Sequence, residues 1–132
     1  MTFQVVARDN RANGGGINTA TSTVTVDGAS GPFNVTQPNT GIVWTTGSSQ
    51  TVTWNVANTT AAPVSCANVR ILLSTDGGNS FPTVLDASTA NDGTDTITVP
   101  NLPSTTARVK VEAVGNIFLT FPILTSSSML RR

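Results

Sequence analysis

The stretch Gln50-Thr51-Val52-Thr53-Trp54-Asn55-Val56 alternates between polar and apolar side chains without a break. Val52, Trp54 and Val56 fall on one face of an extended chain, and the Thr and Asn side chains fall on the other. Because successive side chains of a β-strand point to opposite faces, this pattern predicts a strand with one buried face. Trp54 occupies the inward phase, so we expect it at the centre of a hydrophobic core.

The same period of two recurs along most of the chain, and no window shows a convincing helical stripe. The turn dipeptides Asp27-Gly28, Asp76-Gly77 and Asp92-Gly93 separate the alternating segments. Short strands with frequent turns predict an all-β protein, an antiparallel β-sandwich of about seven to nine strands, with a closed barrel as the alternative. The side chains expected in its core are Val52, Trp54, Val56, Val69, Ile71, Leu73, Val109 and Val111.

Composition excludes several classes of function. The chain has 132 residues, no histidine and a single cysteine, Cys66. Without histidine there is no Ser-His or Cys-His catalysis and no histidine-ligated zinc. A formal net charge of zero gives no electrostatic reason to bind nucleic acid or an anionic membrane. Cys66 lacks an internal disulfide partner, and its apolar neighbours predict a buried thiol.

The segment Ala29-Ser30-Gly31-Pro32 is typical of an interdomain linker, being small, polar and stiffened by proline. It divides the chain into a β-hairpin at 1–28, the linker at 29–32, a sandwich at 33–117 and an atypical tail at 118–132. An isolated hairpin is marginal in water. Residues 1–28 therefore either close a preceding module or pair with a sandwich, their own or a neighbour's, and the sequence leaves both open. The first residues, Met1 to Val6, show no basic start followed by an apolar run, so we expect no signal peptide in this sequence.

Ser74-Thr75-Asp76-Gly77-Gly78-Asn79-Ser80-Phe81 is the most specific local pattern. It resembles the Asp-box, a hairpin motif of many secreted β-domains. We expect a structural turn in which Asp76 accepts hydrogen bonds from turn N–H groups, Gly77 and Gly78 supply permissive dihedrals, and Phe81 fills the core beneath. One carboxylate beside two glycines is too few ligands for calcium. The turn residues of this prediction are Ser74, Asp76, Gly78, Ser80 and Phe81.

No set of residues predicts catalysis. Most of the seven carboxylates stand in apparent loops, and nothing predicts two of them facing each other across a cleft. We therefore expect no catalytic site, no metal and no cofactor. Trp44, beside Thr45-Thr46-Gly47, is either a core residue at a strand end or an exposed platform on which a sugar ring stacks.

The run from Gly31 to Phe118 resembles the β-sandwich modules that follow the catalytic domain in large secreted reprolysin-like zinc metallopeptidases of Bacteroidetes-type bacteria. The segments that carry the resemblance are Gly31-Pro32-Phe33, Thr51 to Thr59, Val69 to Gly78 and Ala107 to Asn116, together with Val6 to Arg11 for the preceding module. The resemblance implies an Ig-like or fibronectin III-like accessory role and an extracellular location in the parent protein. It carries over no catalytic residue, because the H-E-x-x-H zinc helix needs histidine.

The end of the chain departs from that family. Such modules continue after Gly115-Asn116-Ile117-Phe118 with a strand of the type F-D-I-S-N, whereas this chain continues from Leu119 to Arg132 with a different sequence. A shifted reading frame in the gene is one hypothesis, which the DNA sequence would test. Pro122 predicts that this segment is an edge strand or a loose tail.

Three functions are compatible with these observations. The first is a non-catalytic extracellular module with a binding, spacer or adhesion role, whose partners are the neighbouring domains of a parent polypeptide. The second is self-assembly with copies of itself, in which residues 1–28 complement the open sheet edge of a neighbour. The third is a carbohydrate-binding module that holds a glycan on Trp44.

Overall fold

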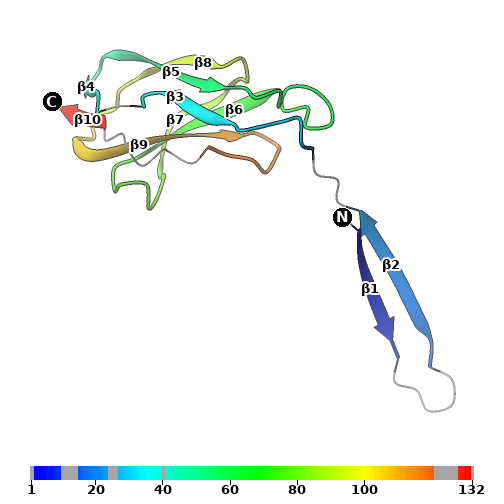
Figure 1. Cartoon of the computed structure of the whole chain (residues 1–132). Helices are drawn as coiled ribbons and strands as arrows, with labels where there is room; N and C mark the ends of the chain where they lie inside the picture. The colour runs from blue at the N-terminus through cyan, green and yellow to red at the C-terminus, as the bar shows by residue number, and fades with distance from the viewer. Residues whose placement is uncertain (1, 10–14, 24–26, 40, 121–127, 132) are drawn as a thin grey trace.

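The computed structural model describes residues 2–9, 15–23, 27–39, 41–120 and 128–131, and ten β-strands lie in these ranges. No described residue is helical, which confirms the predicted all-β class. Eight strands form two stacked sheets and the first two form a separate hairpin (Figure 1). The strands belong to two facing sheets with free edges, and not to a closed barrel.

The larger sheet has five strands, in the order β4 (Val43–Thr45), β10 (Ser128–Arg131), β9 (Ser104–Ala113), β6 (Asn68–Ser74) and β7 (Thr83–Ala90). The smaller sheet has three, in the order β3 (Asn34–Gln37), β5 (Ser49–Asn55) and β8 (Thr94–Thr98). Neighbouring strands are antiparallel except β10 and β4, which run parallel.

The core lies between the two sheets because the inward phase of each alternating segment is apolar. Val52 and Trp54 of the smaller sheet meet Ile71 and Val111 of the larger one in a single buried cluster. Of the eight expected core residues, seven are buried, and Val56 is half-buried against the same cluster. Cys66 is buried in the cluster as a free thiol that donates to the Asn68 carbonyl oxygen at 3.2 Å. Burial raises the pKa of this thiol.

The turn from β7 to β8 depends on glycine. Gly93 has a φ of 98°, and a Cβ placed there would stand 3.1 Å from the Trp54 carbonyl oxygen. The Trp54 N–H in turn donates to the Gly93 carbonyl oxygen at 2.9 Å. A side chain at this position would therefore meet both an unfavourable dihedral and a close backbone atom.

The hairpin consists of β1 (Thr2–Arg8) and β2 (Ile17–Thr23), paired antiparallel from Thr2 opposite Thr23 to Arg8 opposite Ile17. Every residue of both strands is exposed, and the hairpin extends away from the sandwich (Figure 1). In the sequence, Val24 and Val26 alternate with Thr23, Thr25 and Asp27 and so predict a strand there, but residues 24–26 lie outside the described part of the chain.

The C-terminal half of the linker is attached to the sandwich. The Gly31 N–H donates to the Ala57 carbonyl oxygen at 3.0 Å, and the Ser30 hydroxyl donates to the Asn58 carbonyl oxygen at 3.4 Å. Ser30 and Gly31 therefore fix the end of the linker that adjoins the sandwich.

The expectation of an edge strand or a loose tail at the C-terminus is wrong for residues 128–131. β10 lies between β4 and β9 and pairs with both. Its four residues, Ser128 to Arg131, each keep a backbone N–H, so they can pair on two sides; Pro122 itself lies outside the described residues. The larger sheet consequently extends beyond the boundary expected at residue 117.

Candidate functional site

A cleft of about 590 Å³ lies at the end of the sandwich where the chain enters. We call it the linker cleft. Three segments build it: the linker, the loop that follows β5 and the loop that follows β9. Its lining residues are Asp27, Ser30, Gly31, Phe33, Thr59, Pro63, Val64, Asn116, Ile117, Phe118 and Leu119.

An aromatic pair forms the apolar part of the linker cleft. The rings of Phe33 and Phe118 pack edge to face, with centroids 4.9 Å apart and planes at 73°. Beside them Ile117 is 99% exposed at the tip of its loop. Asn116 steadies this loop, since its side-chain amide donates to the Val64 carbonyl oxygen at 3.0 Å. The arrangement offers an apolar side chain a ready contact surface.

Asp27 is the one charged residue among the described lining of the linker cleft. Hydrogen bonds from the Ser30 side chain and from the Ala29 N–H lower the pKa of its carboxyl. A single ionised carboxylate without a facing acid or base does not assemble an acid–base pair. The described lining of the linker cleft is mainly apolar and carries one carboxylate.

A buried polar network lies behind the linker cleft and centres on Asn91, which is 4% exposed. Its side-chain oxygen accepts the Trp54 indole N–H at 3.0 Å. Its amide donates to the Thr59 hydroxyl at 2.9 Å and to the Cys66 carbonyl oxygen at 3.1 Å. These bonds join the central tryptophan to the β5–β6 loop, so they set the shape of one wall of the linker cleft.

In the Asp-box-like turn, the Asp76 side chain accepts hydrogen bonds from two hydroxyl groups and from one backbone N–H group. The Asp76 carboxylate accepts the Ser74 hydroxyl at 2.6 Å, the Ser80 hydroxyl at 2.6 Å and the Ser80 N–H at 3.0 Å. The Gly78 N–H donates to the Ser74 hydroxyl at 2.9 Å. The bonds from Ser74 and Ser80 hold the pKa of Asp76 well below its ordinary range. With its oxygens used inside the turn, Asp76 acts as a structural group.

Phe81 does not fill the core, contrary to the expectation for this turn. It is half-buried and is absent from the residues that pack against the core cluster. Its ring lies under the Lys110 ammonium, 4.7 Å from the ring centroid. Lys110 is in the outward phase of β9, so Phe81 covers the outer face of the larger sheet and not its inner face.

Trp44 is 3% exposed and belongs to the core cluster. Its position on β4 directs the ring between the sheets, while its neighbours Val43 and Thr45 are exposed. No ring face is free for stacking on a sugar. The hypothesis that Trp44 is an exposed platform for a glycan is therefore wrong, and Trp44 is a core residue.

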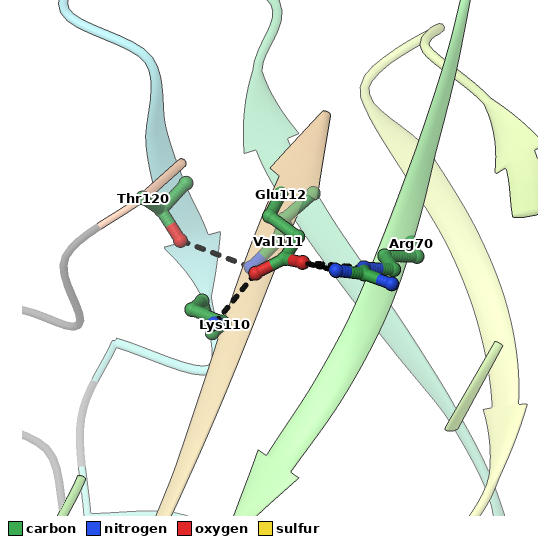
Figure 2. A network of polar contacts seen from close by, with 5 residues as sticks. All are labelled: Arg70, Lys110, Val111, Glu112 and Thr120. Atoms are coloured by element: carbon green, nitrogen blue, oxygen red, sulfur yellow. Dashed lines mark hydrogen bonds and ion pairs between the residues drawn. The ribbon is translucent and has the colours of Figure 1, made fainter. Parts of the chain in front are cut away.

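A charged network crosses the outer face of the larger sheet (Figure 2). Glu112 on β9 forms ion pairs with Arg70 on β6 and with Lys110, whose ammonium is 2.6 Å away. Burial by itself raises the pKa of Glu112, but hydrogen bonds and positive charge from Lys110 and Arg70 outweigh it, so the pKa is lowered. All carboxylate contacts are internal to the network.

Two further carboxylates, those of Asp86 and Asp92, accept backbone N–H groups two residues further along the chain. Asp86 accepts the Ser88 N–H at 2.7 Å and Asp92 accepts the Thr94 N–H at 3.2 Å. In the described part of the chain no group of three or more acidic or cysteine residues could hold a metal ion. Among the same residues no helix is long and apolar enough to cross a membrane.

Sequence reasoning missed two groups that the structure brings to this region. Asn91 precedes Asp92-Gly93, so it looks like an ordinary turn residue, and only its contact with Trp54 reveals its role. The linker cleft is made by loops that are distant in sequence, and no local pattern signals it. In the sequence, the only signal for the linker cleft is the pair of large apolar residues Ile117 and Phe118 directly after Gly115-Asn116, a pair of turn residues. In the structure, Ile117 is exposed.

Comparison of the chain with protein-family models, with curated proteins and with solved structures finds no match.

Proposed function

We propose that this protein is a non-catalytic, Ig-like or fibronectin III-like accessory module of a larger secreted polypeptide, with a binding, spacer or adhesion role. The observation that carries the proposal is the attachment of a short linker to one end of a sandwich with its own core, beside an apolar cleft. A module inside a longer chain needs these parts: an independent core, an entry point, and a surface that receives its neighbour.

The order of the strands supports the Ig-like assignment. The smaller sheet takes the first, third and sixth strands of the sandwich, which corresponds to strands A, B and E of the immunoglobulin fold. The larger sheet places β10, β9, β6 and β7 side by side, which corresponds to G, F, C and C′. The non-catalytic assignment is supported by four carboxylates that are already used in local hydrogen bonds or ion pairs, those of Asp76, Asp86, Asp92 and Glu112.

Limited proteolysis of the full chain tests the module. We expect cleavage between residues 23 and 30 to release the hairpin and to leave the sandwich with an unchanged, cooperative thermal transition followed by tryptophan fluorescence. Both tryptophans belong to the sandwich core, so the signal reports the sandwich alone. A sandwich that loses its cooperative transition when the linker is cut contradicts the proposal.

Self-assembly is a second candidate, favoured by the exposed hairpin. Phe3 is 51% exposed and Val5 is 69% exposed on β1, although such side chains usually find a contact surface. Within the described residues, the outer edges of β3 and β8 have no neighbouring strand. Strand addition between copies would use both features. Self-assembly is tested by measuring the mass of the protein in solution at several concentrations, and we expect the mass to rise with concentration.

A further inference from the structure

The two sheets of the sandwich are unequal, and the smaller one leaves part of the larger one uncovered. Five strands face three. β7 and β8 are in contact at the same side of the sandwich, where both sheets end. No residue of β7 is buried, and Leu85 is half-buried beside the core. One more pair of strands beside β8 would cover β7.

The free edge of β8 has backbone groups available for such a pair. Since the Trp54 N–H donates to the Gly93 carbonyl oxygen, Gly93 and every second residue after it direct their backbone groups toward β5. Thr96 and Thr98 therefore direct their N–H and C=O groups away from β5, toward an edge at which no described strand pairs.

Asp95, on the same strand β8, has a buried polar atom without a hydrogen-bond partner in the described structure. Its backbone partner on β5 is Val52, which is fully buried, so the Asp95 side chain is on the inner face. Its Oδ2 atom is buried without a hydrogen-bond partner in the described structure. A buried carboxylate oxygen without a donor is unfavourable, and a segment that brings donors to this edge would relieve it.

The hairpin has a face that fits this opening. Phe3, Val5 and Ala7 of β1 share one face with the residues opposite them on β2, which are Ser22, Ala20 and Asn18. This face is apolar but brings a hydroxyl and an amide donor. Because the Asp9 N–H donates to the Gly16 carbonyl oxygen, Gln4, Val6 and Arg8 direct their backbone groups to the outer edge of β1.

We propose that β1 of a second copy pairs with the free edge of β8 and lays its Phe3 and Val5 face over β7. The proposal rests on the self-assembly candidate and names its acceptor. A second copy is favoured over the same chain because the linker is attached beside β3, at the opposite edge of the smaller sheet, and the hairpin points away from its own sandwich (Figure 1). The contact is head to tail, so it can continue from copy to copy.

Proline substitutions at the two edges test the contact in the full chain. Val6→Pro removes an N–H from the outer edge of β1 but none from the β1–β2 ladder, and Thr96→Pro does the same for β8. Sedimentation velocity from micromolar to millimolar concentration should show association of the wild type. Each proline variant should raise the apparent dissociation constant about tenfold or more. The matched variants Val6→Thr and Thr96→Val keep the N–H groups and should associate like the wild type.

A mixture of the two proline variants provides the sharper readout. Val6→Pro retains an intact β8 edge and Thr96→Pro retains an intact β1 edge, so the mixture should form a one-to-one complex that neither variant forms alone. Hydrogen exchange of the wild type checks the contact without any substitution. Peptides covering Thr2–Arg8 and Thr94–Thr98 should gain protection together as the concentration rises.

The outcomes separate the two levels of the proposal. A wild type that stays monomeric at every concentration overturns both the β8 contact and self-assembly. A wild type that associates while Thr96→Pro associates equally well overturns the β8 contact and leaves self-assembly in place. Gain of protection in β1 with none in β8 also overturns the β8 contact.

Discussion

Asn91 is a buried polar side chain that forms hydrogen bonds with three partners, Trp54, Thr59 and Cys66. We expect Asn91→Ala to lower the free energy of unfolding by about 2–4 kcal/mol, since the Trp54 indole N–H and the Cys66 carbonyl oxygen lose their partner. Urea denaturation followed by tryptophan fluorescence measures the change. Asn101→Ala, in an exposed loop, is the control and should change it by less than about 0.5 kcal/mol.

Asp76 gives the stability of the protein a dependence on acid. Hydrogen bonds lower its folded-state pKa below the ordinary value of 3.8, so its contribution is present above that value and is lost as the pH falls through the folded-state pKa. We expect the melting temperature to fall between about pH 5 and pH 2. Asp76→Asn should flatten this decline, and Ser80→Ala should flatten it in part.

Glu112 contributes to the same acid dependence with the same sign, because its pKa is also lowered. Glu112 is present in both Asp76→Asn and the wild type. The difference between the two proteins in how steeply the melting temperature falls with pH therefore reports on Asp76. Identical slopes for the two proteins would contradict the assigned role of Asp76.

At the scale of the strands, the segment after β9 folds back and pairs irregularly with β9 at Leu119 and Thr120. Thr120 is fully buried, its N–H donates to the Val111 carbonyl oxygen at 2.8 Å, and its hydroxyl accepts the Val111 N–H at 3.0 Å (Figure 2). A side chain therefore replaces a backbone carbonyl in the ladder. Ser128 is eight positions after Thr120 in the chain, but their partners on β9, Ala107 and Val111, are only four positions apart.

Substitution of Thr120 tests this side-chain bond. Thr120→Val has nearly the same shape but no acceptor, so it leaves the Val111 N–H buried and unpaired. We expect a loss of about 1–3 kcal/mol in the free energy of unfolding. Thr120→Ser keeps the hydroxyl and should lose less than half as much in the same urea experiment. Equal losses for the two variants would show that packing, and not the hydrogen bond, matters at this position.

The strands and the Asp-box-like turn could be predicted because their signals are local. Alternation places Val52 and Trp54 on one face wherever β5 pairs, and the Ser74-to-Ser80 turn closes its own hydrogen bonds within seven residues. Phe81 was misplaced because its partner, Lys110, is distant in sequence. The position of β10 between β4 and β9 was missed for the same reason, since strand pairing depends on long-range contacts.

For the molecule as a whole, the hairpin and the sandwich should unfold independently in dilute solution. Val5 directs its backbone groups toward β2, so Val5→Pro should break the hairpin. The free energy of unfolding of the sandwich, measured by tryptophan fluorescence, should change by less than about 0.5 kcal/mol. Ile71→Ala, in the shared core of the two sheets, is the contrasting variant and should cost about 2–5 kcal/mol.

A larger effect of Val5→Pro would mean that the hairpin packs on its own sandwich. That result would favour an intramolecular contact for residues 1–28 over the contact with a second copy. The experiment is therefore best done at a concentration below that at which the wild type associates.

The amino-acid order alone specifies an all-β chain, the inward phase of its strands, the turn around Asp76 and the absence of histidine chemistry. These follow from the two-residue period of an extended backbone and from side-chain chemistry, both of which operate within a few residues. The burial of Trp44, the central place of β10, the Asn91 network, the linker cleft and the open edge of β8 arise only when distant strands pair. Pairing partners are chosen by the packing of the whole core, and no short segment contains that information.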